Sequence, residues 1–312
     1  MKAKSIVITG GAGFIGSNLA RELSKDNDVV VIDDLSTGHI SNIQDLIDNK
    51  SITLIKGSIT DLKLLHKNFK NVDYVFHQAA IPSVPRSIKD PVRSNNVNVN
   101  GTLNVLVAAK DNDIKKVVYA SSSSVYGDTP TLPKQEDMKP CPLSPYAVSK
   151  LTGEHYCTVF TNVYGLKTVC LRYFNVYGPW QDPNGEYAAV IPKFINLVLK
   201  NKPPVIFGDG LQTRDFTYIN DVVNANILAM ERKATGIFNI AGGKRITINN
   251  LVESIMDIQA VRIDPIYEAP RPGDIKHSFA DISKAKNKIG YTPSFDIKNG
   301  LMATIKWFQK QV

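Results

Sequence analysis

The sequence lacks long apolar runs and contains few cysteines. No uninterrupted apolar stretch approaches the roughly 18 residues of a membrane-spanning helix. The three cysteines, Cys141, Cys157 and Cys170, have no metal-ligand spacing, and their odd number argues against a disulfide framework. No signal peptide precedes the first strand-like segment. We therefore expect a soluble, globular, cytoplasmic protein without a metal site.

Basic clusters are absent as well, although the net charge is +8. The lysines are spread along the whole chain, and no basic block is interleaved with aromatic residues as a nucleic-acid groove would require. A lysine-rich solvated surface explains the charge best, and anionic small substrates come next. With 43% hydrophobic and 21% charged residues, the chain is too apolar to be disordered throughout. Its 312 residues predict two domains or one elaborated α/β domain.

Buried-strand patterns alternate with helical patterns in the first half of the chain. Helical spacing of apolar residues occurs at Phe14–Ser24, Val97–Asn112 and Tyr146–Tyr164. Continuous apolar strands alternating with helices predict a parallel sheet covered on both faces, that is, a doubly wound α/β domain. The strands expected in it are Ser5–Thr9, Val29–Asp33, Ile52–Lys56, Asp73–His77, Lys116–Ser121 and Lys167–Tyr173.

The pattern changes after residue 175, where loops rich in glycine and proline separate shorter elements. We place a domain boundary there, between residues 1–175 and a smaller, mixed α/β domain of residues 176–312, with a cleft between the two. Later segments are expected to return to the first domain. The second part is predicted to contain helices at Val190–Lys200, Asp221–Arg232 and Ile248–Ile258, and short strands at Val205–Phe207, Gly236–Ile240 and Ile266.

A glycine-rich turn lies between the first predicted strand and the first predicted helix. In a Rossmann-type fold Gly10 permits the tight turn, Gly13 lets the backbone approach a pyrophosphate, and Gly16 lets the helix pack on the strand. The N-terminus of the helix attracts the phosphates. The second strand ends in Asp33, which can accept hydrogen bonds from an adenosine ribose, and no arginine follows it to hold a 2′-phosphate. The pattern therefore predicts NAD rather than NADP.

A tyrosine and a lysine four residues apart open a predicted helix, so Tyr146 and Lys150 share one helical face. A free phenol has a pKa near 10, and an adjacent ammonium and a positively charged nicotinamide would lower it. Such a pair also occurs on solvated helix faces, but here it follows a dinucleotide turn and the serine run Ser121–Ser124. That run continues a buried strand, so its hydroxyls are expected at the carboxyl end of the sheet, where α/β proteins bind ligands. We therefore predict that the pair is catalytic.

The G-x-x-G-x-x-G spacing and the Tyr146–Lys150 pair resemble the short-chain dehydrogenase/reductase superfamily, and the chain length and later motifs resemble its extended branch. The similarity reaches to about Gly300 and is closest to UDP-hexose 4-epimerases, particularly UDP-N-acetylglucosamine 4-epimerases, over residues 77–91, 143–150 and 171–192. The resemblance implies tightly bound NAD in the first domain and a nucleotide sugar in the second. It also implies a homodimer through a four-helix bundle built from Val97–Asn112 and Tyr146–Tyr164, with no nucleic-acid or membrane partner.

The resemblance assigns the chemistry to Ser122, Tyr146 and Lys150, while the register of the serine within Ser121–Ser124 stays open. Tyr146 would take the proton of the sugar 4-hydroxyl, and Ser122 would hold the 4-oxygen. Lys150 would lower the tyrosine pKa and bind the nicotinamide ribose. Hydride would pass from C4 to NAD and return to the other face of a transient 4-keto sugar. The implied cofactor contacts are Gly10, Gly13, Phe14, Ile15, Gly16, Asp33, Asp34, Ser36, Thr37, Gly38, Ser58, Ile59, Gln78, Ala79, Ala80, Asn98, Tyr146, Lys150 and Tyr173.

Two arginines and one serine define the substrate side in this resemblance. Arg214 and Arg271 would clamp a diphosphate, which suits bidentate guanidiniums, although either could instead form a surface salt bridge. Ser278 stands where epimerases restricted to UDP-glucose carry a tyrosine, which implies room for an N-acetyl group unless a neighbouring side chain fills the space. UDP-GlcNAc and UDP-GalNAc are thus expected substrates, together with UDP-Glc and UDP-Gal. The implied substrate contacts are Ser83, Ser122, Ser123, Ser124, Tyr146, Asn175, Ala189, Val190, Phe194, Val205, Phe207, Arg214, Arg271, Asp274 and Ser278.

Three other functions fit parts of the pattern. A UDP-glucuronate 4-epimerase would need a polar or basic group for the C6 carboxylate, and the sequence does not locate one. A 4,6-dehydratase is disfavoured because Ser123 and Ser124 stand where it would carry an Asp-Glu pair. A non-catalytic NAD-binding protein would be expected to lose Tyr146 or Lys150, and both are present.

His77, at the end of the fourth predicted strand, is interpreted as a hydrogen-bonded structural histidine.

Overall fold

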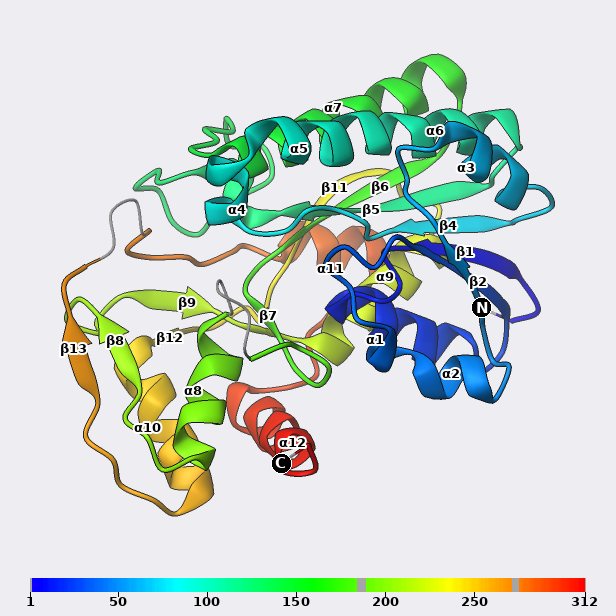
Figure 1. Ribbon diagram of the computed structural model, residues 1–312. Helices are drawn as coiled ribbons and strands as arrows, with labels where there is room; N and C mark the ends of the chain where they lie inside the picture. The colour runs from blue at the N-terminus through cyan, green and yellow to red at the C-terminus, as the bar shows by residue number, and fades with distance from the viewer. Residues whose placement is uncertain (1, 184–188, 271–274, 312) are drawn as a thin grey trace.

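A seven-stranded parallel sheet forms the centre of the computed structural model, which describes residues 2–183, 189–270 and 275–311 (Figure 1). Its strand order is β11-β6-β5-β4-β1-β2-β3, so β1 lies inside the sheet and the chain winds outward on both sides of it. This is the predicted doubly wound sheet, and the six predicted strands are confirmed to within one residue at each end. The strands are β1 (Ser5–Thr9), β2 (Asp28–Asp33), β3 (Thr53–Lys56), β4 (Tyr74–His77), β5 (Lys116–Ser122), β6 (Thr168–Tyr173) and β11 (Gly236–Ile240).

Helices cover both faces of the sheet, and Figure 1 shows them as two layers. Alternate residues of a strand point to opposite faces. Ile6 and Ile8 of β1 belong to the core under α1 and α9, whereas Val7 belongs to the core under α3, α6 and α7. Burial on both sides explains why the strands are apolar without interruption. The helices of these layers are α1 (Phe14–Leu23), α2 (Gln44–Asp48), α3 (Leu62–Asn68), α6 (Gly101–Asp111), α7 (Pro145–Tyr164), α9 (Ile219–Glu231) and α11 (Ser283–Ile289).

The helix predicted at Val97–Asn112 is longer and less regular than expected. α5 (Pro91–Asn95) runs into α6 through a π-helical turn, η2 (Asn96–Asn100). A short helix, α4 (Val84–Lys89), precedes α5 and packs with it against α7. Periodicity alone could not show the π turn, because one extra residue hardly changes the apolar spacing. Such turns are frequent at functional sites.

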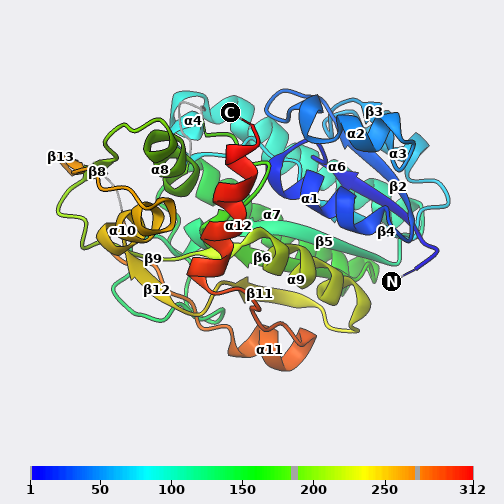
Figure 2. The ribbon, with the colours of Figure 1, turned by 90° about the horizontal axis from the view of Figure 1, so that it is seen from below.

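Shorter elements make up the second part of the molecule (Figure 2). The predicted helices are confirmed as α8 (Val190–Leu199), α9 and α10 (Ile248–Gln259). Of the elements in this part of the chain, α9 packs on the central sheet and β11 forms one edge of it. A further helix, α12 (Ile297–Gln309), packs against α8 and α10 and was not predicted. Three strand pairs complete this part: β7 (Val176–Tyr177) with β10 (Thr217–Tyr218), β8 (Val205–Phe207) with β13 (Ile266–Glu268), and β9 (Thr213–Asp215) with β12 (Arg245–Thr247).

The cysteines are free, Cys157 and Cys170 in the core and Cys141 at the surface. Across the described ranges, no group of three His, Cys, Asp or Glu side chains is arranged to hold a metal ion. In the same part of the chain, no helix combines the length and the apolar character that crossing a bilayer requires.

A buried lysine links the central sheet to α9. Lys116, the first residue of β5, is 4% exposed. Its Nζ donates to the carbonyl oxygens of Ala229 at 3.0 Å and Ala234 at 3.3 Å, and also to that of Arg232. These carbonyls lie in the last turn of α9 and in the residues just after it, where helix carbonyls lack partners and a positive charge is favourable.

Replacing this lysine should destabilise the fold. We expect Lys116→Met to lower the free energy of unfolding by about 2 kcal/mol, because the carbonyl groups at the end of α9 lose a charged donor. Urea denaturation followed by circular dichroism measures the change. The exposed Lys167→Met is the matched control and should leave stability within about 0.5 kcal/mol of wild type. Equal stability of the Lys116→Met protein would contradict this role.

Candidate active site

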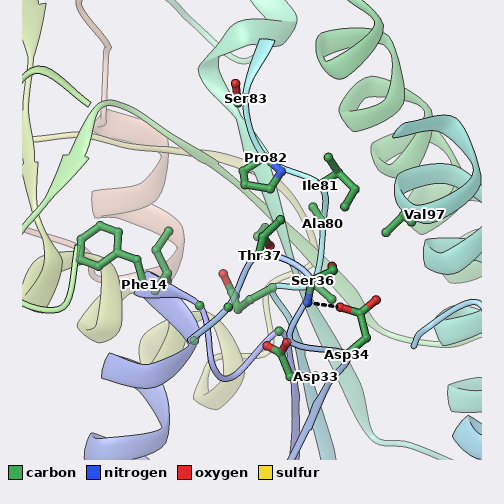
Figure 3. Close-up of a pocket in the computed structure, with 18 of the residues that line it drawn as sticks. Phe14, Asp33, Asp34, Ser36, Thr37, Ala80, Ile81, Pro82, Ser83 and Val97 are labelled. Carbon is green, nitrogen blue, oxygen red and sulfur yellow. Dashed lines mark hydrogen bonds between the residues drawn. The ribbon is translucent and has the colours of Figure 1, made fainter. Parts of the chain in front are cut away.

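A cavity of about 450 Å³ lies at the carboxyl ends of β1, β2, β4 and β5. Figure 3 shows several chain segments around it, with Phe14 from α1, Asp33 at the end of β2, Ser83 before α4 and Val97 from the π turn. The structure thus brings together residues that are far apart in the sequence. The predicted site residues that line the cavity are Gly10, Gly13, Phe14, Ile15, Gly16, Asp33, Asp34, Ser36, Thr37, Gly38, Ser58, Ile59, Gln78, Ala79, Ala80, Ser83, Tyr146, Lys150, Tyr173 and Ala189.

The glycine turn borders this cavity and has little room for side chains. Gly10 has a φ of +73°, and a Cβ there would lie 2.5 Å from the main-chain nitrogen of Ala79. A Cβ on Gly16 would lie 2.1 Å from the carbonyl oxygen of Gly10. Gly13 meets only that oxygen, at 3.2 Å, and is the N-cap of α1 without a side-chain cap. The first N–H groups of α1 are therefore left for an anion, which fits the pyrophosphate of a dinucleotide.

Two adjacent carboxylates at the end of β2 have different partners. Asp33 accepts hydrogen bonds from the main-chain nitrogens of Ala12 at 2.9 Å and Leu35 at 2.8 Å. Burial raises the pKa of Asp33, and these two bonds oppose the shift. Asp34 accepts from the nitrogen of Ser36 at 2.9 Å, the dashed line in Figure 3, and so stabilises the following turn. Both carboxylates line the cavity, where they can accept hydrogen bonds from ribose hydroxyls.

The start of α7 is fixed by its sequence and brings the tyrosine and the lysine to the cavity. Ser144 is the N-cap, and its Oγ accepts a hydrogen bond from the nitrogen of Ala147 at 3.1 Å. Pro145 follows at the first helical position, where it needs no donor. Tyr146 and Lys150 consequently occupy the first turns of the helix, and both line the cavity.

Tyr146 contacts a serine more directly than it contacts the lysine. Its side chain is hydrogen-bonded to Ser122 at the end of β5. Lys150 donates from Nζ to the carbonyl oxygen of Ala120 at 2.8 Å, and Nζ lies 5.8 Å from the centre of the Tyr146 ring. Burial raises the pKa of Tyr146, opposed by the bond to Ser122, and lowers the pKa of Lys150 to about 8. In the protein alone, burial therefore outweighs the effect of the ammonium on the tyrosine pKa. The lower pKa expected when the positively charged nicotinamide is also present stays a prediction.

The serine run is divided between two environments. Ser121 lines the cavity and donates to Oε1 of Glu154 at 2.5 Å. Ser122, the last residue of β5, does not line the cavity, and its Oγ accepts from the nitrogen of Ser124 at 3.2 Å. Ser123 and Ser124 belong to a 3-10 turn, η3 (Ser123–Tyr126), and neither lines the cavity, because the chain turns away after β5.

Asn98 forms hydrogen bonds within the protein next to the cavity, although the resemblance implied that it contacts the cofactor. Its Oδ1 accepts from the nitrogen of Ile81 at 2.7 Å, and its Nδ2 lies 3.1 Å from Oγ of Ser149. It does not line the cavity. The π turn places Asn98 where it can join the segment after β4 to α7.

Asn226 of α9 is a buried residue that the sequence did not suggest. Its Oδ1 lies 3.2 Å from Nε2 of Gln78 and 3.0 Å from the hydroxyl of Tyr173. Gln78 and Tyr173 both line the cavity, and burial raises the pKa of Tyr173 to about 12. No local pattern could have marked Asn226, because its partners, Gln78 just after β4 and Tyr173 on β6, are far away in the chain.

The predicted substrate contacts lie largely outside this cavity. Asn175 has a φ of +37° and donates from Nδ2 to the carbonyl oxygen of Asp215 at 2.9 Å. The main chain of Ser278 is joined to β9, because the Ser278 nitrogen donates to the carbonyl oxygen of Thr213 at 3.0 Å. Arg214, the next residue of β9, donates from Nη1 to that same oxygen at 3.0 Å and to the carbonyl oxygen of Lys276 at 3.2 Å. These residues are gathered around one short strand.

The remaining substrate predictions have mixed outcomes. Phe207 lines a second cavity of about 660 Å³ together with Gln212, Glu268 and Lys276. Phe194 is on the buried side of α8 and belongs to the core, because that helix is amphipathic. Neither cavity is lined by Val190, Phe194, Val205, Arg214, Asn175 or Ser278. Arg271 and Asp274 lie outside the described residues.

Several residues that line the first cavity were not predicted. Trp180, Gln181 and Asp182 come from the segment after β7, and His39 and Arg86 come from the loop before η1 (Ile40–Asn42) and from α4. The sequence assigns no contact to Trp180, Gln181 or Asp182, although they lie within residues 171–192 that carry the resemblance. Their position beside the cavity depends on tertiary packing, which no local pattern reports.

The fold and the cavity define an NAD-binding α/β enzyme of the short-chain dehydrogenase/reductase type, and comparison with known proteins agrees. Residues 6–241 match the profile of the NAD dependent epimerase/dehydratase family, and the chain belongs to this family. The resemblance seen in the sequence is thereby confirmed.

Individual relatives extend along the whole chain. A putative UDP-glucose 4-epimerase of Methanocaldococcus jannaschii is 43% identical over 307 residues, 97% of this chain and 98% of that protein. A solved UDP-N-acetylglucosamine 4-epimerase from Methanobrevibacter ruminantium M1, in complex with UDP-N-acetylmuramic acid, is 47% identical with a TM-score of 0.97, covering 100% of both chains. A UDP-glucuronic acid 4-epimerase from Bacillus cereus, solved with UDP-glucuronic acid and NAD, is 36% identical with a TM-score of 0.90, covering 99% of this chain and all of that one.

His77 is a structural histidine, as the sequence indicated. Its Nδ1 lies 2.8 Å from Oγ1 of Thr9, and its Nε2 lies 2.9 Å from Oγ1 of Thr102. The ring is 1% exposed, and burial lowers its pKa to about 3, with Lys150 adding to the shift. The unfolded chain therefore binds a proton between about pH 6.5 and pH 3 that the folded chain does not, so stability falls as the pH falls through this window.

Removing the imidazole should weaken this pH dependence. Between pH 7 and pH 5, the free energy of unfolding of His77→Gln should fall less than that of wild type. We expect the two decreases to differ by about 2 kcal/mol. Urea titrations at the two pH values give the difference. The half-exposed His66→Gln serves as control and should follow wild type. If the free energy of unfolding of His77→Gln fell between the two pH values by as much as that of wild type, this account would be contradicted.

Proposed function

We propose that this protein interconverts the C4 epimers of a UDP-hexose, with UDP-GlcNAc and UDP-GalNAc as substrates together with UDP-Glc and UDP-Gal. The observation behind the proposal is that Tyr146 and Lys150 line the dinucleotide cavity and that Tyr146 is hydrogen-bonded to Ser122 at the end of β5. Relatives along the whole chain are named as UDP-sugar 4-epimerases, which supports it. We further propose that residues 1–175 mainly hold NAD and residues 176–312 mainly hold the nucleotide sugar.

The residues of the cavity have distinct roles in this proposal. Bound NAD supplies a reversible hydride acceptor for C4 of the sugar. Tyr146 takes the proton of the 4-hydroxyl and returns it. Ser122, which is hydrogen-bonded to Tyr146, orients the 4-oxygen. Lys150 holds the nicotinamide ribose, and its lowered pKa allows it to exchange a proton near neutral pH. Asp33 and the first turn of α1 hold the adenosine ribose and the pyrophosphate.

Space beside the sugar C2 position decides which hexose is accepted. Ser278 is a small residue, and its main chain is fixed to β9 through Thr213. Ser278 lines neither cavity, so the proposal rests on its size: a serine leaves an N-acetyl group the room that a tyrosine at this position would fill. The relative of known structure from Methanobrevibacter ruminantium is named for UDP-N-acetylglucosamine, which supports the same choice.

A UDP-glucuronate 4-epimerase is the second candidate. The sequence did not locate a basic group for the C6 carboxylate, but the structure places Arg86 in the lining of the cavity, together with Ser83 and Tyr146. A guanidinium at this position could pair with a carboxylate. The Bacillus cereus relative, named for UDP-glucuronic acid, keeps this candidate open.

Product analysis with three UDP-sugars tests the proposal. Wild type should convert UDP-GlcNAc and UDP-Glc, and Tyr146→Phe should lose about 100- to 10,000-fold of either rate while remaining folded. Ser278→Tyr should lose about 100-fold on UDP-GlcNAc and retain UDP-Glc, because the larger ring occupies the N-acetyl space. Equal losses on both sugars would contradict that role of Ser278. Conversion of UDP-glucuronate alone, abolished by Arg86→Leu, would favour the second candidate.

We also propose that a second copy of the chain covers one face of α7. Val148, Val159 and Val163 lie along this face and are 50%, 46% and 67% exposed. Ile88 of α4 and Val92 of α5 are also exposed, at 63% and 78%, so the apolar surface extends beyond the two helices expected from the sequence. Apolar stripes on adjacent helices suit a four-helix bundle between two protomers.

Charges in this stripe should separate the protomers. We expect the double variant Val159→Lys/Val163→Lys to halve the mass measured by light scattering after size exclusion, because two copies would bring four lysines together. Leu211→Lys, also at an exposed apolar position, is the control and should keep the wild-type mass. A wild-type protein that is already monomeric would refute the dimer.

A further inference from the structure

The segment after β7 forms part of the wall of the NAD cavity. Trp180, Gln181 and Asp182 line it, although they come from the part of the chain that we assign to the sugar. We call residues 179–182 the strap. In Figure 1 the green loop after β7 extends toward α1 and α12, which are far apart in the sequence.

The strap is attached to α1 and to the loop after β2. The carbonyl oxygen of Pro179 accepts a hydrogen bond from Nδ2 of Asn18 on α1 at 3.2 Å. At the other end, Oδ2 of Asp182 lies 3.7 Å from Nε2 of His39. The strap therefore passes beside the first turns of α1, where the pyrophosphate is expected.

Trp180 is held between two side chains that do not line the cavity themselves. The guanidinium carbon of Arg21 lies 3.9 Å from the centre of the Trp180 ring. The ring of Trp307, from α12, lies 5.2 Å from that of Trp180, at an angle of 56°. Arg21 is fixed in turn, because its Nη2 donates to Asp45 at 2.6 Å and to the carbonyl oxygen of Asn42 at 2.7 Å. The indole thus contacts the Trp307 ring and a guanidinium that is itself held by hydrogen bonds.

The backbone of Trp180 also requires outside support. Its φ is +71°, in the left-handed region that a bulky residue rarely adopts. Such a conformation persists only where the surrounding structure holds it in place. The contacts with Arg21 and Trp307 supply that support, so removing either would allow the strap to relax away from α1.

We propose that Arg21 and Trp307 are positioning residues that hold Trp180 against the NAD cavity and thereby set the rate at which the dinucleotide leaves. The inference rests on the proposed function, since an enzyme that takes hydride from a sugar and returns it must keep its cofactor between the two steps. Neither side chain touches the cavity, so each acts through the strap and not through the chemistry.

Dinucleotide release measures this role directly. Protein loaded with fluorescent 1,N6-etheno-NAD is chased with excess NAD, and the release rate is followed by fluorescence. We expect Arg21→Leu and Trp307→Leu each to release it about fivefold faster, the effect of losing one cation–π or aromatic contact. Their kcat at saturating NAD should equal that of wild type. Trp307→Phe keeps an aromatic ring and should restore slow release.

Controls separate this role from a general loss of stability. Lys25→Leu, just beyond α1, removes only an exposed pair with Glu22 and should release at the wild-type rate. A lower melting temperature of Trp307→Leu with unchanged release would overturn the inference, and so would faster release in Arg21→Leu alone, since that would locate the effect at Asn42 and Asp45. A wild-type protein that binds no dinucleotide would contradict the proposed function itself, whereas bound dinucleotide with unchanged release in both variants contradicts this inference alone.

Discussion

Parallel main-chain pairing brings the ends of five strands to one edge of the sheet, and the cavity depends on that edge. Thr9 is level with Ile32 of β2 and His77 of β4, and Ser122 of β5 is level with Tyr173 of β6. A shift of one residue in any of these pairs would turn the side chains at the strand end to the opposite face. The close approach of Gly10 to the backbone of Ala79 fixes β1 against the chain after β4, so the turn that would hold the pyrophosphate and the segment that would meet the nicotinamide are set together.

A buried ion pair secures the other half of the site. Glu154 lies one turn after Lys150 on α7, and its carboxylate accepts two hydrogen bonds from Arg172 of β6, at 2.8 and 2.7 Å. The same carboxylate accepts from Ser121, and the guanidinium lies 4.6 Å from the centre of the Tyr126 ring. A bidentate pair of this kind has strict geometry, and breaking it would leave an uncompensated charge in the core. It therefore holds α7, with its tyrosine and lysine, in a fixed position relative to the serines at the end of β5.

The sequence was most informative where a local pattern expresses a local requirement. The six strands, the three glycines, Asp33 and the Tyr146–Lys150 pair follow from periodicity, from turn geometry or from spacing along one helix. It was least informative where the requirement is set by a distant neighbour. Asn226, Trp180 and the partners of Lys116 are defined by contacts across more than a hundred residues. The raised pKa of Tyr146 was missed for the same reason, since burial depends on packing that spacing does not report.

The central claim is that one site takes hydride from C4 of the sugar and returns it without exchange. UDP-GlcNAc carrying deuterium at C4 would be incubated with the purified protein in ordinary water, without added cofactor, and the UDP-GalNAc formed would be examined by mass spectrometry and NMR. The account predicts that the product keeps its deuterium at C4, because the same bound cofactor accepts and returns it. Product with hydrogen at C4 would contradict the account, since the label would then have been lost to the solvent or to a second cofactor molecule.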